Sequence, residues 1–333
     1  MQPFAYRRAT RDGEASALAA SHEHAAFIAG GTELLPLCKA GILAPELVID
    51  ISRLPLDAVT STDDGLVIGA LARLSEVADH PLVRRDVPVI VEALNASASP
   101  QIRNVATIGG NLMQRSRCHY FRGDALPCNK RAAGSGCGAR FGENRAHAIF
   151  GASEHCAATH ASDLAVALVA LDARLRLRRP DGERCVLLED FYCQPGDTPW
   201  RETELRPGEL IVAVEIGRGS DACRSSYLKL RDRASFEFAV VSVAAVLAIE
   251  GGRITEARIA AGGVGTKPWR LRGSEKVLRN ETAGETLFRL AASNAADGAV
   301  PLKHNGFKLK LLRRSVLRVL MSLCGVSIAG EPS

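Results

Sequence analysis

The first sixty residues alternate between apolar runs of strand length and segments with helical spacing. Apolar runs at residues 26–29 and 47–51 have the length of strands, whereas residues 11–20 and the intervening LLPLCKA stretch follow a helical pattern. Strands that alternate with helices are typical of parallel strands joined by crossover helices. We therefore expect an N-terminal βαβ unit over residues 1–57.

Residues 58–222 show a second pattern, in which short strand-like runs are separated by helical segments. The strand-like runs are LVIGAL, ARLRLRR, CVLLEDF and ELIVAVEI. They predict a mostly antiparallel α+β layer. The segment 114–157 interrupts this layer, because Gly, Arg, Asn and Ser dominate it and most of it shows neither period. A loop of that length in a compact domain indicates that something besides a hydrophobic core orders it.

Residues 223–333 begin with a hairpin pattern. The runs FEFAVVSVAAVLAIE and RITEARIAAGGVG flank Gly251 and Gly252, which favours a tight turn between two antiparallel strands. Helical spacing follows over residues 269–278, 283–296 and 308–323. The predicted fold class is therefore α+β: two α/β subdomains followed by a C-terminal antiparallel sheet with three helices.

Composition narrows the class of protein. The chain has 333 residues, of which 47% are hydrophobic and 24% are charged, as in ordinary globular proteins. No window reaches the ~18 uninterrupted apolar residues that a membrane helix needs. The N-terminal sequence MQPFAYRRATRDGEA has acidic residues where an export signal would have an apolar region. We expect no membrane span and no export signal in the chain itself.

Four cysteines are clustered within the irregular segment, although the chain has nine in all. They are separated by nine, eight and eighteen residues, and no CxxC pair occurs. Zinc sites usually use close pairs, whereas iron–sulfur clusters accept wider spacing. The residues alone leave an iron–sulfur cluster, a zinc site and free thiols open, and the histidines nearby leave mixed ligation open. The clustered cysteines are Cys118, Cys128, Cys137 and Cys156; the histidines are His119, His147, His155 and His160.

Positive charge is concentrated in the same segment. Residues 114–147 contain seven basic and two acidic side chains, so this stretch alone accounts for the formal net charge of +5. The rest of the chain is balanced, which argues against a nucleic-acid-binding or membrane-binding protein. Concentrated cations would compensate the negative charge of an iron–sulfur cluster held by four thiolates.

Two glycine turns flank this segment on its N-terminal side. The first, Gly30-Gly31-Thr32, lies between an apolar run and a helical pattern; the second is the sequence TIGGN over residues 107–111. Such turns expose backbone N–H groups to a phosphate, although a tight strand-to-helix connection would need the same residues. Asp163 begins the next helix, where a carboxylate is favourable for the helix itself and also suits a ribose or ribityl hydroxyl.

At this point the residues resemble a known family. AGGTELLPL, TIGGN, the SDL helix start, RPGELIVAVEI, YLKLRDRASFEFAVVSVA and AGGVGTKPWR occur in the order typical of one group. That group is the FAD-binding medium subunits of molybdenum hydroxylases of the xanthine dehydrogenase family. The resemblance covers essentially the whole chain. The run NLMQRSRCHYFRGDALPCNKR further resembles the bacterial periplasmic aldehyde oxidoreductase type, in which four cysteines hold a 4Fe–4S cluster.

The resemblance implies a PCMH-type FAD-binding domain over the first two subdomains and a CO dehydrogenase flavoprotein-like domain over residues 223–333. It assigns the FAD pyrophosphate to the first glycine turn, and a second contact to the TIGGN turn. It places Asp163 at a ribose or ribityl hydroxyl, Lys229 near the flavin ring, and the four clustered cysteines on the 4Fe–4S cluster. The turn residues are Ile28, Ala29, Gly30, Gly31, Thr32, Glu33 and Leu34, then Thr107, Ile108, Gly109, Gly110 and Asn111.

The implied function is an electron-transfer subunit without a catalytic residue of its own. Partners would be a large molybdopterin-binding subunit, a small 2Fe–2S subunit and an external electron acceptor. The complex would oxidise a substrate, expected to be an aldehyde, and the chain would reach the periplasm only with a signal-bearing partner and otherwise stay cytoplasmic. The alternative is a free-standing flavin oxidase or dehydrogenase with a zinc-stapled loop. We also expect the glycine turns to pack independently of the cysteine segment.

Overall fold

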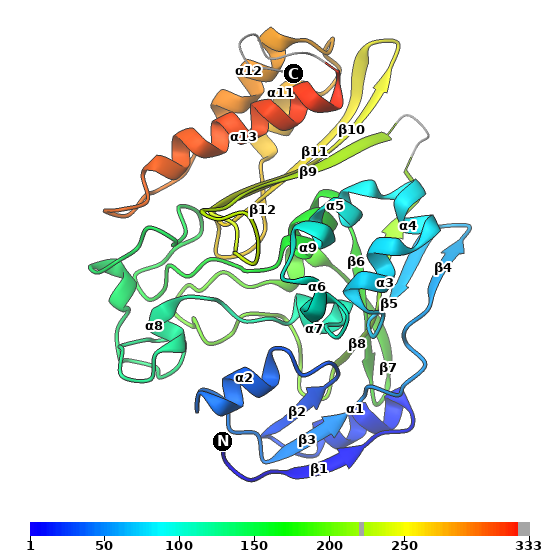
Figure 1. Ribbon diagram of the computed structural model, residues 1–333, viewed down its shortest axis with the longest axis vertical. Helices are drawn as coiled ribbons and strands as arrows, with labels where there is room; N and C mark the ends of the chain where they lie inside the picture. The colour runs from blue at the N-terminus through cyan, green and yellow to red at the C-terminus, as the bar shows by residue number, and fades with distance from the viewer. Residues whose placement is uncertain (220–222, 326–333) are drawn as a thin grey trace.

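The computed structural model describes residues 1–219 and 223–325, and its first unit is the predicted βαβ arrangement (Figure 1). Three parallel strands form a sheet in the order β1-β3-β2. Leu210 and Val212 of a later strand complete the core beneath this sheet, so the N-terminal unit packs directly on the next one. Its elements are β1 (Ala5–Arg8), α1 (Asp12–Ala20), β2 (Ala25–Ile28), α2 (Leu34–Lys39) and β3 (Leu47–Asp50).

The second unit is a five-stranded antiparallel sheet in the order β4-β5-β8-β6-β7. Helix α9 is buried along its whole length, and it packs with α3 and α5 on this sheet. The strands are β4 (Val59–Thr62), β5 (Gly65–Gly69), β6 (Arg174–Arg179), β7 (Gly182–Leu187) and β8 (Leu210–Gly217). The helices are α3 (Leu74–Asp79), α4 (Pro81–Asp86), α5 (Pro88–Ala96), α6 (Pro100–Arg103), α7 (Ile108–Leu112), α9 (Asp163–Ala170) and α10 (Leu188–Phe191).

The third unit is a four-stranded antiparallel sheet in the order β12-β11-β10-β9, with the predicted hairpin at its centre. Helices α11, α12 and α13 cover one face, and α5 and α9 cover the other (Figure 1). Both faces are therefore buried, which explains why β10 is apolar from Val243 to Ile249. The elements are β9 (Cys223–Leu230), β10 (Val241–Glu250), β11 (Arg253–Gly262), β12 (Trp269–Arg270), α11 (Arg272–Leu278), α12 (Glu285–Asn294) and α13 (Phe307–Leu323). The predicted fold class is confirmed.

The cysteine segment is mostly irregular, as expected, and projects to one side of the molecule (Figure 1). Its regular elements are α8 (His119–Arg122) and a 3-10 turn (Gly138–Arg140). It nevertheless builds a small core, because Phe121 and Cys128 are buried against Leu37 of α2. The expectation that the glycine turns pack independently of this segment is therefore wrong: the helix that follows the first turn is one wall of the segment's core.

Within the described residues, no helix combines the length and the apolar character that a membrane crossing requires.

Candidate functional site

The first glycine turn joins β2 to α2 and is pressed against another part of the backbone. Gly31 has a φ of +71°, a conformation that favours glycine. Gly30 has no room for a side chain, because a Cβ atom there would lie 2.1 Å from the carbonyl oxygen of Val105. Val105 lies two positions before the second turn, so the first turn packs against the backbone that leads into the second. Gly30 is therefore required by this backbone contact, whatever ligand lies beside it.

The second turn is not a free turn but the start of helix α7. Thr107 is its N-cap, and its Oγ1 accepts a hydrogen bond from the backbone N–H of Gly110 at 3.2 Å. Gly109 packs against Ala70, and Ile108 is buried in the core, so both have structural roles. Gly110 differs, since a Cβ atom there would meet only Thr107 Oγ1, at 3.0 Å. Its open side faces a cavity.

Two cavities run along these turns and bring the predicted FAD-binding residues together. One of about 250 Å³ is lined by the first turn, from Phe27 to Leu34, and by Thr107. Another of about 220 Å³ is lined by Asn111, Asp163 and Lys229. Their shared lining residues, Thr32, Glu33 and Gly110, make them neighbours. An elongated dinucleotide fits this donor set: hydroxyls and backbone N–H groups at the turns, and charged side chains at the far end.

Asp163 and Lys229 form a buried ion pair at that far end. Their carboxylate and ammonium atoms are 2.8 Å apart, and the two side chains are 6% and 3% exposed. Asp163 also accepts hydrogen bonds from Ser97 Oγ at 2.9 Å and from Tyr227 OH at 2.5 Å. Burial, followed by the neighbouring carboxylate, raises the pKa of Tyr227, so the phenol remains a donor. The carboxylate predicted to hold a sugar hydroxyl therefore already has three protein donors.

The four clustered cysteines come together in the folded chain. Cys128 and Cys137 pair as an isolated antiparallel bridge. Burial raises the pKa of Cys118 to about 12, and the thiols of Cys156 and Cys128 contribute to the rise. Burial likewise raises the pKa of Cys156, with Cys137 and Cys128 contributing. Cys156 is therefore close to the other three thiols, and Cys118 is also close to Cys128. Within residues 1–219 and 223–325, no three or more His, Cys, Asp or Glu side chains are arranged to hold a metal ion.

Glu33 connects the first glycine turn to the cysteine segment. Its Oε1 accepts hydrogen bonds from the backbone N–H of Arg115 at 3.1 Å and from Arg122 Nη2 at 2.5 Å. Its Oε2 lies 2.7 Å from Arg117 Nη2. The Arg117 guanidinium also lies 4.9 Å over the Phe238 ring, and both side chains line the 220 Å³ cavity. No motif predicted these contacts, because the residues come from separate segments.

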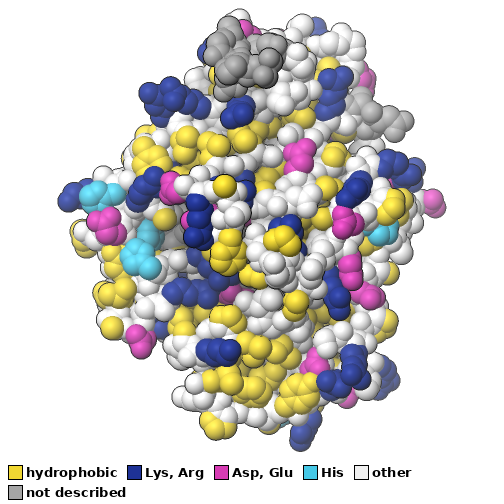
Figure 2. Space-filling view, in the orientation of Figure 1, with side chains coloured by type: hydrophobic (Ala, Val, Ile, Leu, Met, Phe, Trp, Pro, Cys, Tyr) yellow, Lys and Arg dark blue, Asp and Glu magenta, His cyan; other side chains and the backbone are white. Residues whose placement is uncertain are grey.

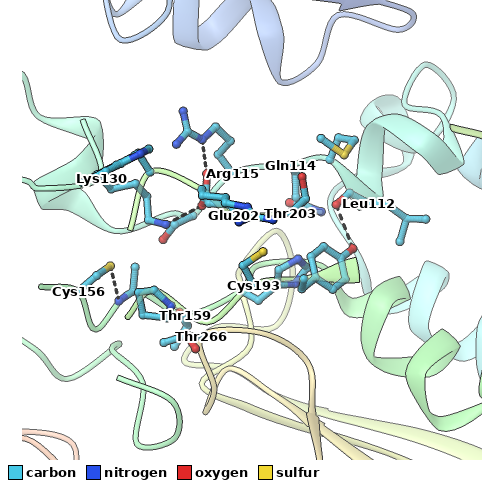
Figure 3. Close-up of a pocket in the computed structure, with 18 residues that line it drawn as sticks. Leu112, Gln114, Arg115, Lys130, Cys156, Thr159, Cys193, Glu202, Thr203 and Thr266 are labelled. Atoms are coloured by element: carbon cyan, nitrogen blue, oxygen red, sulfur yellow. Dashed lines mark hydrogen bonds and ion pairs between the residues drawn. The ribbon is translucent and has the colours of Figure 1, made fainter. Parts of the chain in front are cut away.

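A third cavity, of about 230 Å³, separates the cysteine segment from residues 192–203 (Figure 3). Figure 3 shows Lys130 and Arg115 directed at the carboxylate of Glu202, with Cys156 on the opposite wall. Burial raises the pKa of Glu202, but Lys130 and Arg115 outweigh it and the net pKa is lowered. Glu202 is therefore a charged carboxylate in the same cavity as a predicted cluster ligand, which sequence reasoning missed.

Carboxylates pair with six of the segment's seven cations, and all but Glu154 lie outside the segment. Glu33 and Glu202 each bind two, and Glu154 and Asp232 bind one each. Figure 2 accordingly shows basic side chains interspersed with acidic ones on this face of the molecule. The expectation of a concentrated positive charge free to compensate a metal cluster is therefore too simple. Much of that charge is neutralised, and histidines gather at the edge of the face where the segment lies (Figure 2).

Known proteins share both the sequence and the fold of this chain. Residues 2–218 match the FAD binding domain in molybdopterin dehydrogenase, and residues 226–323 match the CO dehydrogenase flavoprotein C-terminal domain. The chain is 46% identical to the aldehyde oxidoreductase FAD-binding subunit PaoB of Escherichia coli over 324 residues, 96% of this chain and 98% of that one. It is 28% identical to the glyceraldehyde dehydrogenase medium chain of Sulfolobus acidocaldarius, covering 95% of each.

A solved structure of carbon monoxide dehydrogenase from Hydrogenophaga pseudoflava contains a chain of the same fold. The TM-score is 0.77 at 25% identity, covering 98% of this chain and 99% of that one. Sequence matches over nearly the full length, the same fold and two adjoining cavities at the glycine turns all agree. The chain is an FAD-binding subunit of the molybdenum hydroxylase family.

Proposed function

We propose that the chain is the FAD- and 4Fe–4S-containing electron-transfer subunit of a molybdenum-dependent aldehyde oxidoreductase. The 46% identity to an aldehyde oxidoreductase subunit over nearly its whole length carries this proposal. The relatives at 25–28% identity are named for several substrates, among them glyceraldehyde, carbon monoxide and xanthine. A large molybdopterin-binding subunit and a small 2Fe–2S subunit would complete the complex. Bound FAD would accept electrons from the partners' centres and deliver them to an external acceptor.

The chain's own residues position the flavin. The N–H groups of the Gly30 turn and of α7, with the hydroxyls of Thr32 and Thr107, would bind and orient the pyrophosphate at the shared end of the two cavities. The Asp163–Lys229 pair closes the other end with little solvent access. No side chain there is arranged as a base for substrate hydroxylation, so we assign that chemistry to a partner.

We further propose that Cys118, Cys128, Cys137 and Cys156 ligate the 4Fe–4S cluster. Their wide spacing and the mutual influence of their thiols support this ligand set. Cluster binding would require all four thiols to lose their protons, and because burial raises the pKa of Cys118, its deprotonation would accompany metal binding. Stoichiometric zinc in place of iron would instead support a free-standing flavin oxidase or dehydrogenase with a zinc-stapled loop.

Localisation follows from the same proposal. We propose that the chain reaches the periplasm by co-export with a signal-bearing partner subunit; the alternative is a cytoplasmic location. Fractionation of cells that express the chain with and without its partner subunits tests this.

The proposed role predicts that an aldehyde reduces the flavin only in the complex. The complex is mixed anaerobically with an aromatic or aliphatic aldehyde. Its oxidised-flavin absorbance near 450 nm (about the usual flavin maximum) should then disappear within the time of one turnover. The isolated chain should keep it, although dithionite should bleach both. Bleaching of the isolated chain by aldehyde would contradict the subunit role and favour the free-standing enzyme.

A second prediction concerns the buried ion pair. In Lys229→Met, the Asp163 carboxylate keeps two donors but loses its counter-charge, so the flavin's midpoint potential should fall while flavin content is retained. Breaking a buried pair by removing one partner should also cost about 3–5 kcal/mol of stability. Redox titration and thermal unfolding measure the two effects.

The matched variant is Lys229→Met with Asp163→Asn, which removes both charges. Its midpoint should return toward that of the wild type, because the pair is again neutral overall. An unchanged midpoint in Lys229→Met alone would reject an electrostatic role for Lys229.

A further inference from the structure

His147 makes a polar contact with one of the proposed cluster ligands. Its Nε2 lies 3.2 Å from the Sγ atom of Cys118, and the side chain is almost completely buried. The other ring nitrogen, Nδ1, has no hydrogen-bond partner among the described residues. The contact with sulfur is therefore the hydrogen bond that the fold provides for this ring. Among the described residues, no other side chain hydrogen-bonds the sulfur of a clustered cysteine; Cys156 Sγ accepts only from a backbone N–H, that of Ala158.

The C-terminal unit fixes the backbone that carries this ring. The carbonyl oxygen of His147 accepts hydrogen bonds from Lys308 Nζ at 2.9 Å and from Asn305 Nδ2 at 3.1 Å. Lys308 also donates to the carbonyl oxygen of Gly263 at 2.6 Å, at the end of β11. Both donors are completely buried. A fully buried lysine that binds two carbonyl oxygens is costly for folding, so it needs a structural reason.

Neighbouring hydrogen bonds join the same two segments of the chain. Asn305 donates to the carbonyl of Ala148 at 3.2 Å, and the backbone N–H of His304 donates to Asn144 Oδ1 at 2.8 Å. Asn144 in turn donates to the carbonyl of Ala139 at 3.0 Å. Residues 304–308, at and just before the start of α13, thus hold residues 139–148 in place through buried polar contacts. This part of the cysteine segment is held by the C-terminal unit, just as Glu33 holds the part near Arg117.

We propose that His147 is a positioning residue that donates its Nε2–H to the Cys118 sulfur, and that Asn305 and Lys308 hold it there to set the potential of the cluster. This rests on the cluster ligation proposed above. Reduction adds negative charge that is shared by the ligand sulfurs, and an N–H donor stabilises that charge. The hydrogen bond therefore raises the reduction potential, and its removal lowers it.

His147→Phe tests the proposal, because it preserves a planar ring and removes the donor. In the full complex, the cluster's midpoint, followed by low-temperature EPR during redox titration, should shift to a more negative value. Iron and acid-labile sulfide should stay at the wild-type level. His147→Gln, which restores an N–H donor on a shorter side chain, should recover part of the shift.

His155→Phe is the matched control. This histidine is next to Cys156 in sequence, but its ring is half exposed and lies 3.4 Å from Asp197 instead of a sulfur. Its variant should leave the midpoint unchanged. Full iron with an unchanged midpoint in His147→Phe would overturn the positioning role. Selective loss of iron in both His147 variants would overturn it too, by showing that the imidazole is needed to hold the metal. Wild-type protein without iron would instead defeat the cluster proposal itself.

Discussion

Replacing any one of the four clustered cysteines with alanine is expected to abolish the iron content of the chain. The wild type should contain about four irons and four sulfides, as expected for a cubane held by four thiolates. A three-thiolate site would leave an incomplete cluster in a segment whose own core is small, centred on Phe121. Iron and sulfide analysis of anaerobically purified Cys118→Ala, Cys128→Ala, Cys137→Ala and Cys156→Ala measures the loss.

The scattered cysteines are the controls for this experiment. Cys324 follows the end of α13 and is the cleaner one, so Cys324→Ala should keep its full iron content. Cys38→Ala should also keep it, although Cys38 follows Leu37, which packs on the cysteine segment. Full iron in Cys118→Ala, or zinc in the wild type, would rule out the assignment.

Gly110→Val is expected to reduce bound FAD from a stoichiometric amount to near zero while the chain still folds. Gly110 lines both cofactor cavities, and a Cβ atom there would meet no protein atom closer than Thr107 Oγ1 at 3.0 Å. The added side chain therefore fills ligand space without removing core. Flavin released by acid precipitation, compared with protein concentration and thermal unfolding, measures the effect. We expect one non-covalently bound FAD per chain, so colour that stays in the acid precipitate would contradict this expectation.

Two other glycines separate the ligand effect from a folding effect. Gly13→Val is the control, because a Cβ atom on Gly13 of α1 meets nothing within 4 Å. It should keep its flavin. Gly30→Val should lose flavin through a different cause, since its side chain would collide with the Val105 carbonyl and force the two turns apart. We expect an overpacking cost of about 1–3 kcal/mol there. Normal flavin content in Gly110→Val would show that this cavity wall is not part of the FAD site.

Local pattern predicted the parts of the fold that local sequence determines. The β10–β11 hairpin follows from two long apolar runs around Gly251 and Gly252, and the N-terminal parallel sheet follows from alternating strand and helix patterns. The TIGGN sequence was expected to be a turn, but it forms the first turn of α7. Thr107 caps the start of that helix, and the carbonyls of Gly109 and Asn111 accept the backbone N–H that ends it. The short motif did not reveal these hydrogen bonds.

The chemistry of the site was only half accessible to sequence reasoning. The motifs identified Asp163, Lys229 and the glycine turns, and the fold brings them to adjoining cavities. The motifs could not predict the hydrogen bonds to Asp163. Its donors Ser97, at the end of α5, and Tyr227, in β9, are both far from it along the chain. The same holds for most of the segment's cations, whose carboxylate partners Glu33, Glu202 and Asp232 lie far away along the chain. Such pairings depend on tertiary packing, which leaves no periodic signal in the sequence.

The contacts of Glu33 with the cysteine segment couple the order of that segment to flavin binding at the first glycine turn. One carboxylate receives three donors from the segment while its backbone belongs to the flavin turn. Whatever free energy the ordered segment contributes to flavin affinity, flavin binding returns to the order of the segment by the same factor. If the proposed cluster orders the segment and this order favours flavin binding, insertion of either cofactor would then favour insertion of the other.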